Sequence, residues 1–454
     1  MVHPFLPLTD EDRQEMLRSI GVQDEEELLR AIPEVLRLRE PLPLPRRLSE
    51  WEVYEYLRRL AHRNSGAHTH VCFMGAGAYD HYIPAVVEWV INRSEFQTAY
   101  TPYQAEVSQG TLQTIYEFQS MICQLTGMEV SNASLYDGAS ALAEACLLAT
   151  AATQRRRILI AGTLHPRYRE VARTITAGRE VVLEEVVAED GTAEPELLRQ
   201  RMGEDVAAIV VQQPNFYGTV EEAAPVIGQL AHRHGALFIV VADPVSLGVL
   251  EPPGAYGADV VVGEGQALGI PLSFGGPYLG FFAARKQLIR LMPGRIAAVT
   301  EDAEGRRGFV LTLQTREQQI KRERATSNIC TNQGLMMLAA TVYLAWLGKE
   351  GIQELARQCV QRAHYLAERI AALPGFRLAV PKPFVREFLV YTPTEPEQIV
   401  AAGIQQGFLP GVPTRWMGAR LEGLLIAVTE KRTRAEMDAF VEFLAQFASA
   451  SARA

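Results

Sequence analysis

The chain has 454 residues, and its 53 acidic residues outnumber its 44 basic residues, giving a formal net charge of −9. This length exceeds one simple core and predicts two or three domains. The acidic balance, without a basic stripe among aromatic residues, argues against nucleic acid as the main partner. The five cysteines show no C-x-x-C spacing, which is typical of reduced thiols in a cytoplasmic protein.

Residues 1–65 are predicted to form an N-terminal helical arm, and their early acidic character is unlike a signal peptide. Thr9 is a plausible N-cap and Gly21 a helix stop, while Ser49 and Glu52 form a capping box that opens a later helix. Between these helices lie Pro41, Pro43 and Pro45. Such an arm buries little of itself, so it is expected to wrap the main body or a neighbouring subunit.

No apolar run approaches the length of a membrane-spanning helix. The best candidate, residues 236–250, is interrupted by Asp243 and Pro244. We therefore expect no membrane partner.

Residues 66–325 are assigned to a large α/β domain, because predicted strands and helices alternate from residue 132 to 285. This pattern is typical of a mostly parallel sheet with helices on both faces, whose ligands bind at the carboxyl ends of strands. The expected strands are 158–161, 180–187, 207–212, 236–242, 260–262 and 280–284.

Residues 326–454 are assigned to a smaller C-terminal α/β domain. A charged, amphipathic connection over 286–333 precedes it. Its expected elements are helices at 334–373 and 434–447 and strands at 388–391 and 424–428.

Residues 100–110 gather many polar groups just before a predicted helix over 112–125. Such a position favours anions, because backbone N–H groups point outward at a helix N-terminus. An ordinary turn held by tyrosine hydrogen bonds is an equally good interpretation. The candidate functional side chains are Tyr100, Tyr103, Glu106 and Ser108. Upstream, the Gly75-Ala76-Gly77 turn is weak evidence alone and is interpreted as a close backbone approach to a ligand.

Asp243 follows the most apolar predicted strand, where a buried carboxylate needs a cationic partner such as a protonated pyridine nitrogen. Upstream, Asp137 and Ser140 lie in a loop of small residues that opens a helix and can hold a phosphate. In this order on such a sheet, the two features resemble the large domain of pyridoxal-phosphate enzymes of the aspartate-aminotransferase-like fold, the PLP-dependent transferase fold type I.

Such enzymes need a lysine to form a Schiff base with the cofactor. In that fold the lysine follows the next strand, where this chain has Gln266. The five lysines all lie elsewhere, at positions 286, 321, 349, 382 and 431. We therefore expect the fold without its covalent anchor, and a degenerate pocket around Asp137, Ser140, Asp243 and Gln266.

Three other sets of charged or ligating residues are given no functional role. The histidines have no regular ligand spacing with each other or with cysteine, so no metal site is predicted. The acid-rich residues 184–190 are interpreted as a solvated face. Arg386 is interpreted as a surface arginine, although this fold often binds a substrate carboxylate near that strand.

Five stretches together resemble the P-protein family of the glycine cleavage system. Residues 98–110 (TAYTPYQAEVSQG) carry its signature, with Ala105 where the family usually has proline. The resemblance covers essentially the whole chain, and the length resembles the first half of the bacterial form that is split into two subunits. The other matching stretches are 132–141 (NASLYDGASA), 241–248 (VADPVSLG), 275–277 (GGP) and 326–331 (TSNICT).

The resemblance implies glycine decarboxylation by an α2β2 heterotetramer. The second (β) subunit would anchor pyridoxal phosphate, and the aminomethyl group would pass to the lipoyl arm of the H-protein with release of CO2. Tyr100, Tyr103, Glu106 and Ser108 would reach the β-bound cofactor, and residues 75–77 would line the path by which the lipoyl arm enters. Two rivals stay open: a purely structural or regulatory partner, and an independent transaminase or desulfurase anchored on a lysine such as Lys286.

Overall fold

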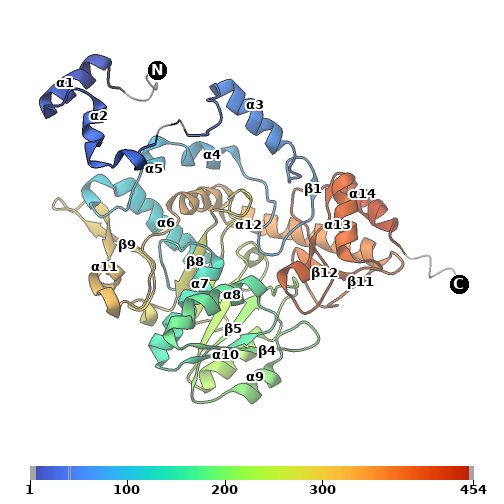
Figure 1. The fold of residues 1–454 in the computed structure, drawn as a ribbon. Coiled ribbons are helices and arrows are strands. Elements are labelled where there is room, and N and C mark those ends of the chain that lie inside the picture. The colour runs from blue at the N-terminus through green and yellow to red at the C-terminus, as the bar shows by residue number, and fades with distance from the viewer. Residues whose placement is uncertain (1–6, 39, 41, 449–454) are drawn as a thin grey trace. The chain divides into compact units, whose positions relative to one another are not determined.

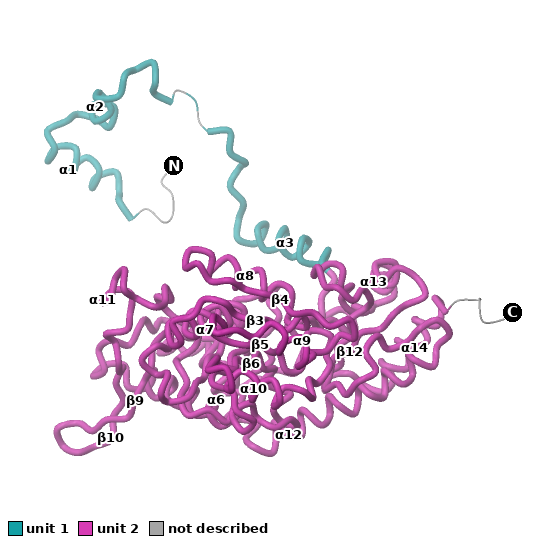
Figure 2. Tube along the Cα trace, turned by 90° about the horizontal axis from the view of Figure 1, so that it is seen from below, with its two compact units in different colours: residues 1–64 teal, residues 65–454 magenta. Residues whose placement is uncertain are grey.

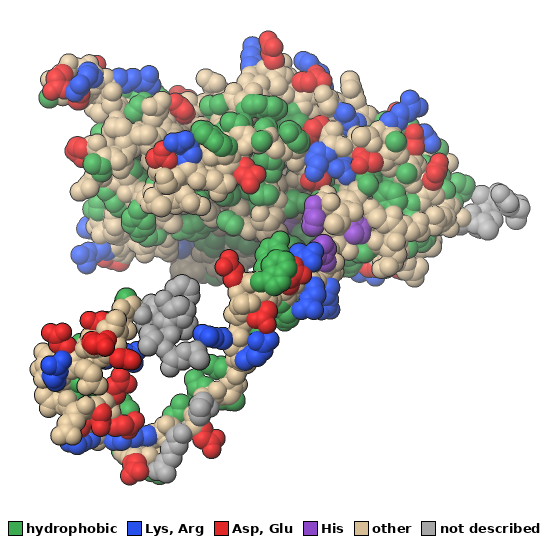
Figure 3. All heavy atoms as spheres, turned by 90° about the horizontal axis from the view of Figure 1, so that it is seen from above, with side chains coloured by type: hydrophobic (Ala, Val, Ile, Leu, Met, Phe, Trp, Pro, Cys, Tyr) green, Lys and Arg blue, Asp and Glu red, His purple; other side chains and the backbone are tan. Residues whose placement is uncertain are grey.

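The structure, a computed structural model, describes residues 7–38, 40 and 42–448 (Figure 1). The chain divides into two compact units, residues 1–64 and residues 65–454, and each is described by itself (Figure 2). The predicted first residues of the arm and Pro41 lie outside the described residues. On the face seen in Figure 3, basic and acidic side chains are interspersed.

The first unit has helices but almost no core. Helix α1 (Asp10–Ile20) begins with the predicted Thr9 cap and ends at Gly21, whose φ of 86° is left-handed. Helix α3 (Glu50–Ala61) begins with the predicted Ser49–Glu52 capping box, and α2 (Glu25–Leu28) lies between them. Leu17 is the only buried residue in the described part of this unit. A segment with so little burial cannot offset the entropy of ordering its chain by itself.

A seven-stranded sheet forms the centre of the second unit and confirms the predicted mostly parallel arrangement. Its order is β2-β8-β7-β6-β5-β3-β4, and β8 alone runs antiparallel to its neighbours. The strands are β2 (Val130–Ser131), β3 (Arg157–Ala161), β4 (Val182–Val186), β5 (Val206–Gln213), β6 (Leu237–Ala242), β7 (Val260–Glu264) and β8 (Gly280–Ala284).

Side chains of successive strand residues enter two different cores, because they point to opposite faces of a sheet. On β5, Ile209 and Val211 face one core with helices α6 (Gln109–Thr126), α10 (Ala224–Arg233) and the first half of α12. Ala208 and Val210 face the other core, with α7 (Gly138–Thr153) and α8 (Pro166–Thr176). Figure 1 shows α7 and α8 beside these strands.

A smaller sheet forms a separate core at the C-terminal side. Its order is β11-β12-β15-β14, all antiparallel. Strand β1 (Val71–Cys72) pairs with β13 (Phe408–Leu409), and Phe73 stacks on Phe440 with ring centroids 4.2 Å apart. The remaining elements here are β11 (Arg377–Leu378), β12 (Glu387–Tyr391), β14 (Val412–Pro413), β15 (Leu424–Ala427), α13 (Pro396–Gln405) and α14 (Arg434–Ala445).

Helix α12 (Gly334–Ala371) packs against both cores and bends at Gly348, whose φ of 61° and ψ of −173° are not helical. By length and composition alone it could cross a membrane, a possibility that sequence analysis did not raise. Apolar residues from both halves, including Tyr343 and Leu366, are buried within the protein. A buried core helix passes the same test, so the observation is weak evidence for a membrane span.

Residues 286–333 are not only a charged connection. They contain an antiparallel hairpin of β9 (Ile296–Glu301) and β10 (Arg307–Thr312). Two glutamines of α6 clamp its backbone: Gln119 bonds both the N–H and C=O of Ala297, and Gln109 those of Phe309. The charged turn between the strands hid this pattern. Other short helices are α4 (Ala85–Ile91), α5 (Ser94–Gln97), α9 (Pro195–Arg201) and α11 (Gln318–Lys321).

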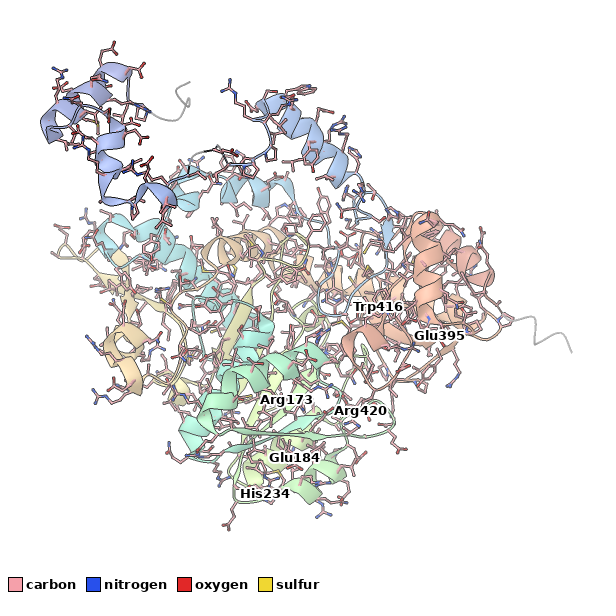
Figure 4. The ribbon with its side chains drawn as sticks, in the orientation of Figure 1. Arg173, Glu184, His234, Glu395, Trp416 and Arg420 are labelled. Atoms are coloured by element: carbon pink, nitrogen blue, oxygen red, sulfur yellow. The ribbon has the colours of Figure 1, made fainter. Side chains whose placement is uncertain are left out.

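The acid-rich stretch of β4 is paired rather than simply solvated. Glu184 accepts from Arg157 at 2.8 Å, while Glu185 pairs with Arg169 and lies 3.6 Å from Arg420. Figure 4 marks Glu184 and Arg420. Because β4 is an edge strand, these charges also protect it from pairing with another chain.

Replacing Phe118 by alanine tests the α6 contribution to the core. Phe118 is fully buried, so Phe118→Ala should destabilise the protein by about 3–5 kcal/mol. Phe274 is 93% exposed, so Phe274→Ala should change stability by less than about 0.5 kcal/mol. Urea unfolding followed by circular dichroism should show a lower midpoint for the first variant only, and equal midpoints would contradict the assignment of this core.

Candidate functional site

Residues 75–82 run between the central sheet and the small sheet, held by side chains from both. Gln266, after β7, accepts from Tyr79 N at 2.8 Å and donates to Tyr79 O at 3.1 Å. Glu387, on β12, accepts from Ala76 N at 2.6 Å and from the Tyr79 hydroxyl at 2.8 Å. A Cβ at Gly75 would lie 2.1 Å from Glu387 Oε1, so this close approach requires glycine.

Arg386 is buried and is the cationic partner of Asp243. Its Nη2 donates to Asp243 Oδ1 at 2.6 Å, and its guanidinium lies 3.5 Å from the centroid of the Tyr79 ring. The interpretation of Arg386 as a surface residue is therefore wrong. The sequence offered one signal: Arg386 and Glu387 are charged residues inside an otherwise apolar strand pattern, where unpaired charges would be very costly.

The ion pair extends to His81 and Glu430. Arg386 Nη1 bonds His81 Nε2, and since a guanidinium only donates, we assign Nε2 as the acceptor. Nδ1 then carries the proton and donates to Glu430 Oε2 at 2.6 Å. The bonds thus run from Glu430 through His81 and Arg386 to Asp243. We call these four residues, together with Tyr79, the Asp243 cluster.

Burial and charge act in opposite directions within the Asp243 cluster. Burial lowers the pKa of Arg386, but Asp243 and Tyr79 raise it and the net shift is upward, so it stays a cation. Burial raises the pKa of Glu430, but the bonds from His81 and the Tyr82 amide prevail and the net pKa shift is downward. For neighbouring Glu387, burial raises the pKa to about 7.

The N-terminus of α7 is occupied by two acidic side chains. Asp137 accepts from Ser140 N at 2.7 Å, and Glu264 accepts from Gly138 N at 3.0 Å. Glu264 also accepts from the backbone N–H groups of Gln266 and Leu279. Burial raises the pKa of Glu264 to about 8. Two of the N–H groups that could bind a phosphate here, those of Gly138 and Ser140, are thus already bonded.

A cavity of about 340 Å³ lies beside these residues. His165 borders it, donating from Nε2 to Ala76 O at 3.0 Å while Nδ1 accepts from Arg167 N. Burial lowers the pKa of His165 to about 4, so the ring is neutral near pH 7. None of the described lining residues is lysine or arginine; they include Ala76, Gly77, Tyr136, Asp137, Tyr168 and Glu264.

The residues expected to hold pyridoxal phosphate do not fit that cofactor here. Position 266 carries an amide rather than an amine, and the Asp243 carboxylate is already paired with Arg386. A phosphate at the start of α7 would face Asp137 and Glu264 instead of free N–H groups. The chain's own side chains already bond the groups expected to hold the cofactor.

The structure also gathers His81, Cys359 and Glu430, whose ligating atoms all lie within 4.8 Å of one another. Irregular sequence spacing concealed this grouping. Both ring nitrogens of His81 are engaged, and the adjacent Arg386 guanidinium repels a cation. We therefore interpret His81 and Glu430 as members of the Asp243 cluster, with Cys359 beside them.

The loop of residues 100–110 forms a second, separate group of predicted site residues. Tyr100 is 89% exposed, and neither its side chain nor that of Glu106 has a hydrogen-bond partner among the described residues. The Tyr103 hydroxyl donates to Glu317 at 2.9 Å and accepts from Gln319 at 2.7 Å. Ser108 immediately precedes α6 without capping it through its side chain. Tyr103 thus behaves as the turn interpretation expects, whereas Tyr100 and Glu106 do not.

The predicted residues therefore fall into two places. Ala76, Gly77 and Asp137 line the 340 Å³ cavity. Gly75, Asp243 and Gln266 lie beside its lining, bonded to or packed on Glu387, Arg386 and Tyr79, and Ser140 lies at the start of α7. None of the four loop residues lines that pocket. A different cavity of about 190 Å³ lies under Tyr100, between α5, α6 and the start of α12.

Comparison with known proteins finds relatives over almost the whole chain. The glycine cleavage system P-protein family matches residues 3–444. A protein of Prosthecochloris aestuarii named "Probable glycine dehydrogenase (decarboxylating) subunit 1" is 54% identical over 443 residues, which are 97% of this chain and 99% of that protein.

Solved structures confirm the predicted fold class, the aspartate-aminotransferase-like PLP-dependent transferase fold type I. A crystal structure of glycine decarboxylase (P-protein) of the glycine cleavage system, in inhibitor-bound form, has a TM-score of 0.89 and 45% identity, covering 98% of this chain and 100% of that one. A sphingosine-1-phosphate lyase from Burkholderia pseudomallei, at 15% identity and a TM-score of 0.65 over 92% of this chain and 94% of that one, shares the fold alone. The chain belongs to the P-protein family of the glycine cleavage system.

Proposed function

We propose that this chain is the first subunit of a two-subunit glycine dehydrogenase (decarboxylating), and that it completes an active site whose pyridoxal phosphate is anchored on the second (β) subunit. The observation that carries the proposal is that Asp243 is paired with Arg386 and that position 266 has no lysine, in a chain of this family. A chain that cannot hold the cofactor needs a partner that does. The subunit name of its relatives agrees with such a division.

The proposed complex is an α2β2 heterotetramer in the cytoplasm. The cofactor on the β subunit supplies an electron sink for the decarboxylation of glycine, and the aminomethyl group passes to the lipoyl arm of the H-protein. Residues 75–77 of this chain line the path of that arm. We also propose that the chain is organised as an arm of residues 1–65, a large domain of residues 66–325 and a small domain of residues 326–454.

In this proposal the loop of residues 100–110 is the catalytic contribution of the chain. Tyr100 and Glu106 are free to meet groups of the β subunit, because no described side chain holds them. A phenol can donate to a phosphate or to the cofactor, and a carboxylate can orient a group or exchange a proton. Tyr103 and Ser108 belong to the same surface, with Tyr103 held from behind by Glu317 and Gln319.

A purely structural partner is the second candidate, and the internal bonds of Tyr103 favour it. The independent transaminase or desulfurase is less well supported, because Lys286 is exposed after β8 and does not line the 340 Å³ cavity. Glycine–bicarbonate exchange by the β subunit, with and without this chain, tests the proposed function. Full exchange without this chain would overturn it.

The isolated chain should form no covalent adduct with pyridoxal phosphate. After borohydride reduction, mass spectrometry should find no stoichiometric phosphopyridoxyl group on the chain or on its Gln266→Lys variant, because Arg386 still pairs with Asp243 and Asp137 and Glu264 still bond the start of α7. The β subunit provides the positive control. A stoichiometric adduct on one lysine of the unaltered chain would refute the proposal, and an adduct at position 266 would show that the pocket admits the cofactor.

The chain should be poorly behaved alone and stable with its partner. Its first unit has one buried residue in the described part and exposes Trp51 and Tyr54 on α3, surface that an obligate interface would cover. Analytical ultracentrifugation should give heterogeneous species for the chain and one heterotetrameric species for the mixture. A well-folded monomer without affinity for the β subunit would contradict this expectation.

Tyr103→Phe and Glu106→Gln should each lower turnover of the assembled enzyme without changing assembly. Charge-assisted hydrogen bonds contribute about 1.5–3 kcal/mol, or roughly tenfold to a hundredfold in rate if they act only in the transition state. Tyr391→Phe and Glu354→Gln, far along the chain from this loop, serve as matched controls. If both loop variants keep full activity in intact heterotetramers, as checked by gel filtration, the loop has a structural role and not a catalytic one.

A further inference from the structure

Three of the stretches that carried the family resemblance meet at one residue outside all of them, Arg295. Its carbonyl accepts from Ala133 N at 2.8 Å, in the stretch 132–141. Its side chain contacts Tyr103, in the signature loop, and the end of the stretch 326–331. The last stretch has no role in the proposed function so far.

The Arg295 guanidinium bridges two of these segments directly. Nη2 donates to Cys330 O at 2.7 Å and lies 3.4 Å from the Tyr103 hydroxyl, while Nη1 donates to Thr331 Oγ1 at 3.2 Å. The guanidinium carbon lies 5.6 Å from the centroid of the Tyr103 ring, within range of a cation–π interaction. Arg295 is only 6% exposed, and its Nε has no partner among the described residues.

An arginine is chemically suited to this position. Its planar fork presents several donors in fixed directions and its face stacks on aromatic rings, whereas lysine offers one compact ammonium group. A buried cation that leaves Nε unpaired is costly, so arginine here does not simply fill space. The hairpin that Arg295 precedes is itself clamped to α6 by Gln109 and Gln119, so the guanidinium projects from a rigid frame.

We propose that Arg295 is the positioning residue of the signature loop. It holds Tyr103 against Cys330 and Thr331, so that residues 100–110 meet the partner's active site in one conformation. Replacing the Arg295 guanidinium would free the loop without removing any group that touches the reacting molecules. The proposal rests on the proposed function for its catalytic consequence, but its structural part is measurable separately.

Hydrogen exchange in the assembled complex tests the structural part. In Arg295→Met and Arg295→Lys, amides of the loop such as Tyr103 N and Ser108 N should exchange roughly tenfold to a hundredfold faster, the factor expected when one or two hydrogen bonds to a charged group are lost. Arg316→Lys is the matched control, because Arg316 donates to Met292 O and Gly294 O nearby without contacting Tyr103. Unchanged loop exchange in both Arg295 variants, or equal loosening in the control, would overturn the proposal.

A double-mutant cycle with Tyr103→Phe tests the catalytic part. If Arg295 acts through Tyr103, Arg295→Lys should lower kcat per assembled complex roughly tenfold in the unaltered background and much less in Tyr103→Phe. A merely structural role would lower the amount of complex or its Tm, and the effects of the two substitutions on the activation free energy would then be additive. That result would overturn the positioning role. If the loop loosens while Tyr103→Phe, Glu106→Gln and Arg295→Lys all keep full kcat, the role of Arg295 in holding the loop stands and the proposed catalytic role of the loop fails.

Discussion

The buried pair of Asp243 and Arg386 is the interaction on which the rest of this structure depends. Removing one partner of such a pair leaves an uncompensated charge in a low-dielectric interior, which is strongly destabilising. Asp243 follows β6 of the central sheet and Arg386 directly precedes β12 of the small sheet, so the pair links two cores. Residues 75–82 are fixed between them because Tyr79 covers the guanidinium and bonds Glu387.

In the proposed function, the fold keeps the layout of a cofactor site while the chain's own side chains take the attachment points. Arg386 pairs with Asp243, and the carboxyl groups of Asp137 and Glu264 accept hydrogen bonds at the start of α7. The Gln266 amide bonds the Tyr79 backbone at the position where a lysine would react. These replacements reinforce each other: Glu264 also bonds the backbone N–H of Gln266, which in turn holds Tyr79 over Arg386. Reversing one of them leaves the others in place.

In the proposed function, the chemistry that this chain contributes lies on its surface loop. That loop is built in two ways at once. The Tyr103 hydroxyl bonds Glu317, Gln319 and Arg295, while the side chains of Tyr100 and Glu106 have no partners in the described chain. A loop fixed at Tyr103, with Tyr100 and Glu106 unbonded, is suited to presenting groups to another subunit, because pre-organisation lowers the entropic cost of binding.

The sequence by itself determined the local structure and the family. Helix caps at Thr9 and Ser49, the apolar strands and the missing lysine at Gln266 follow from neighbouring residues or from single positions, which is why they were predictable. Only the tertiary structure decided the charge partners: Asp243 with Arg386, Gly138 N–H with Glu264, and Tyr103 with Arg295 and Glu317. These pairs join residues more than a hundred positions apart. No propensity or periodicity encodes them, because the energy of a buried charge depends on which chain segments the fold brings within a few ångströms.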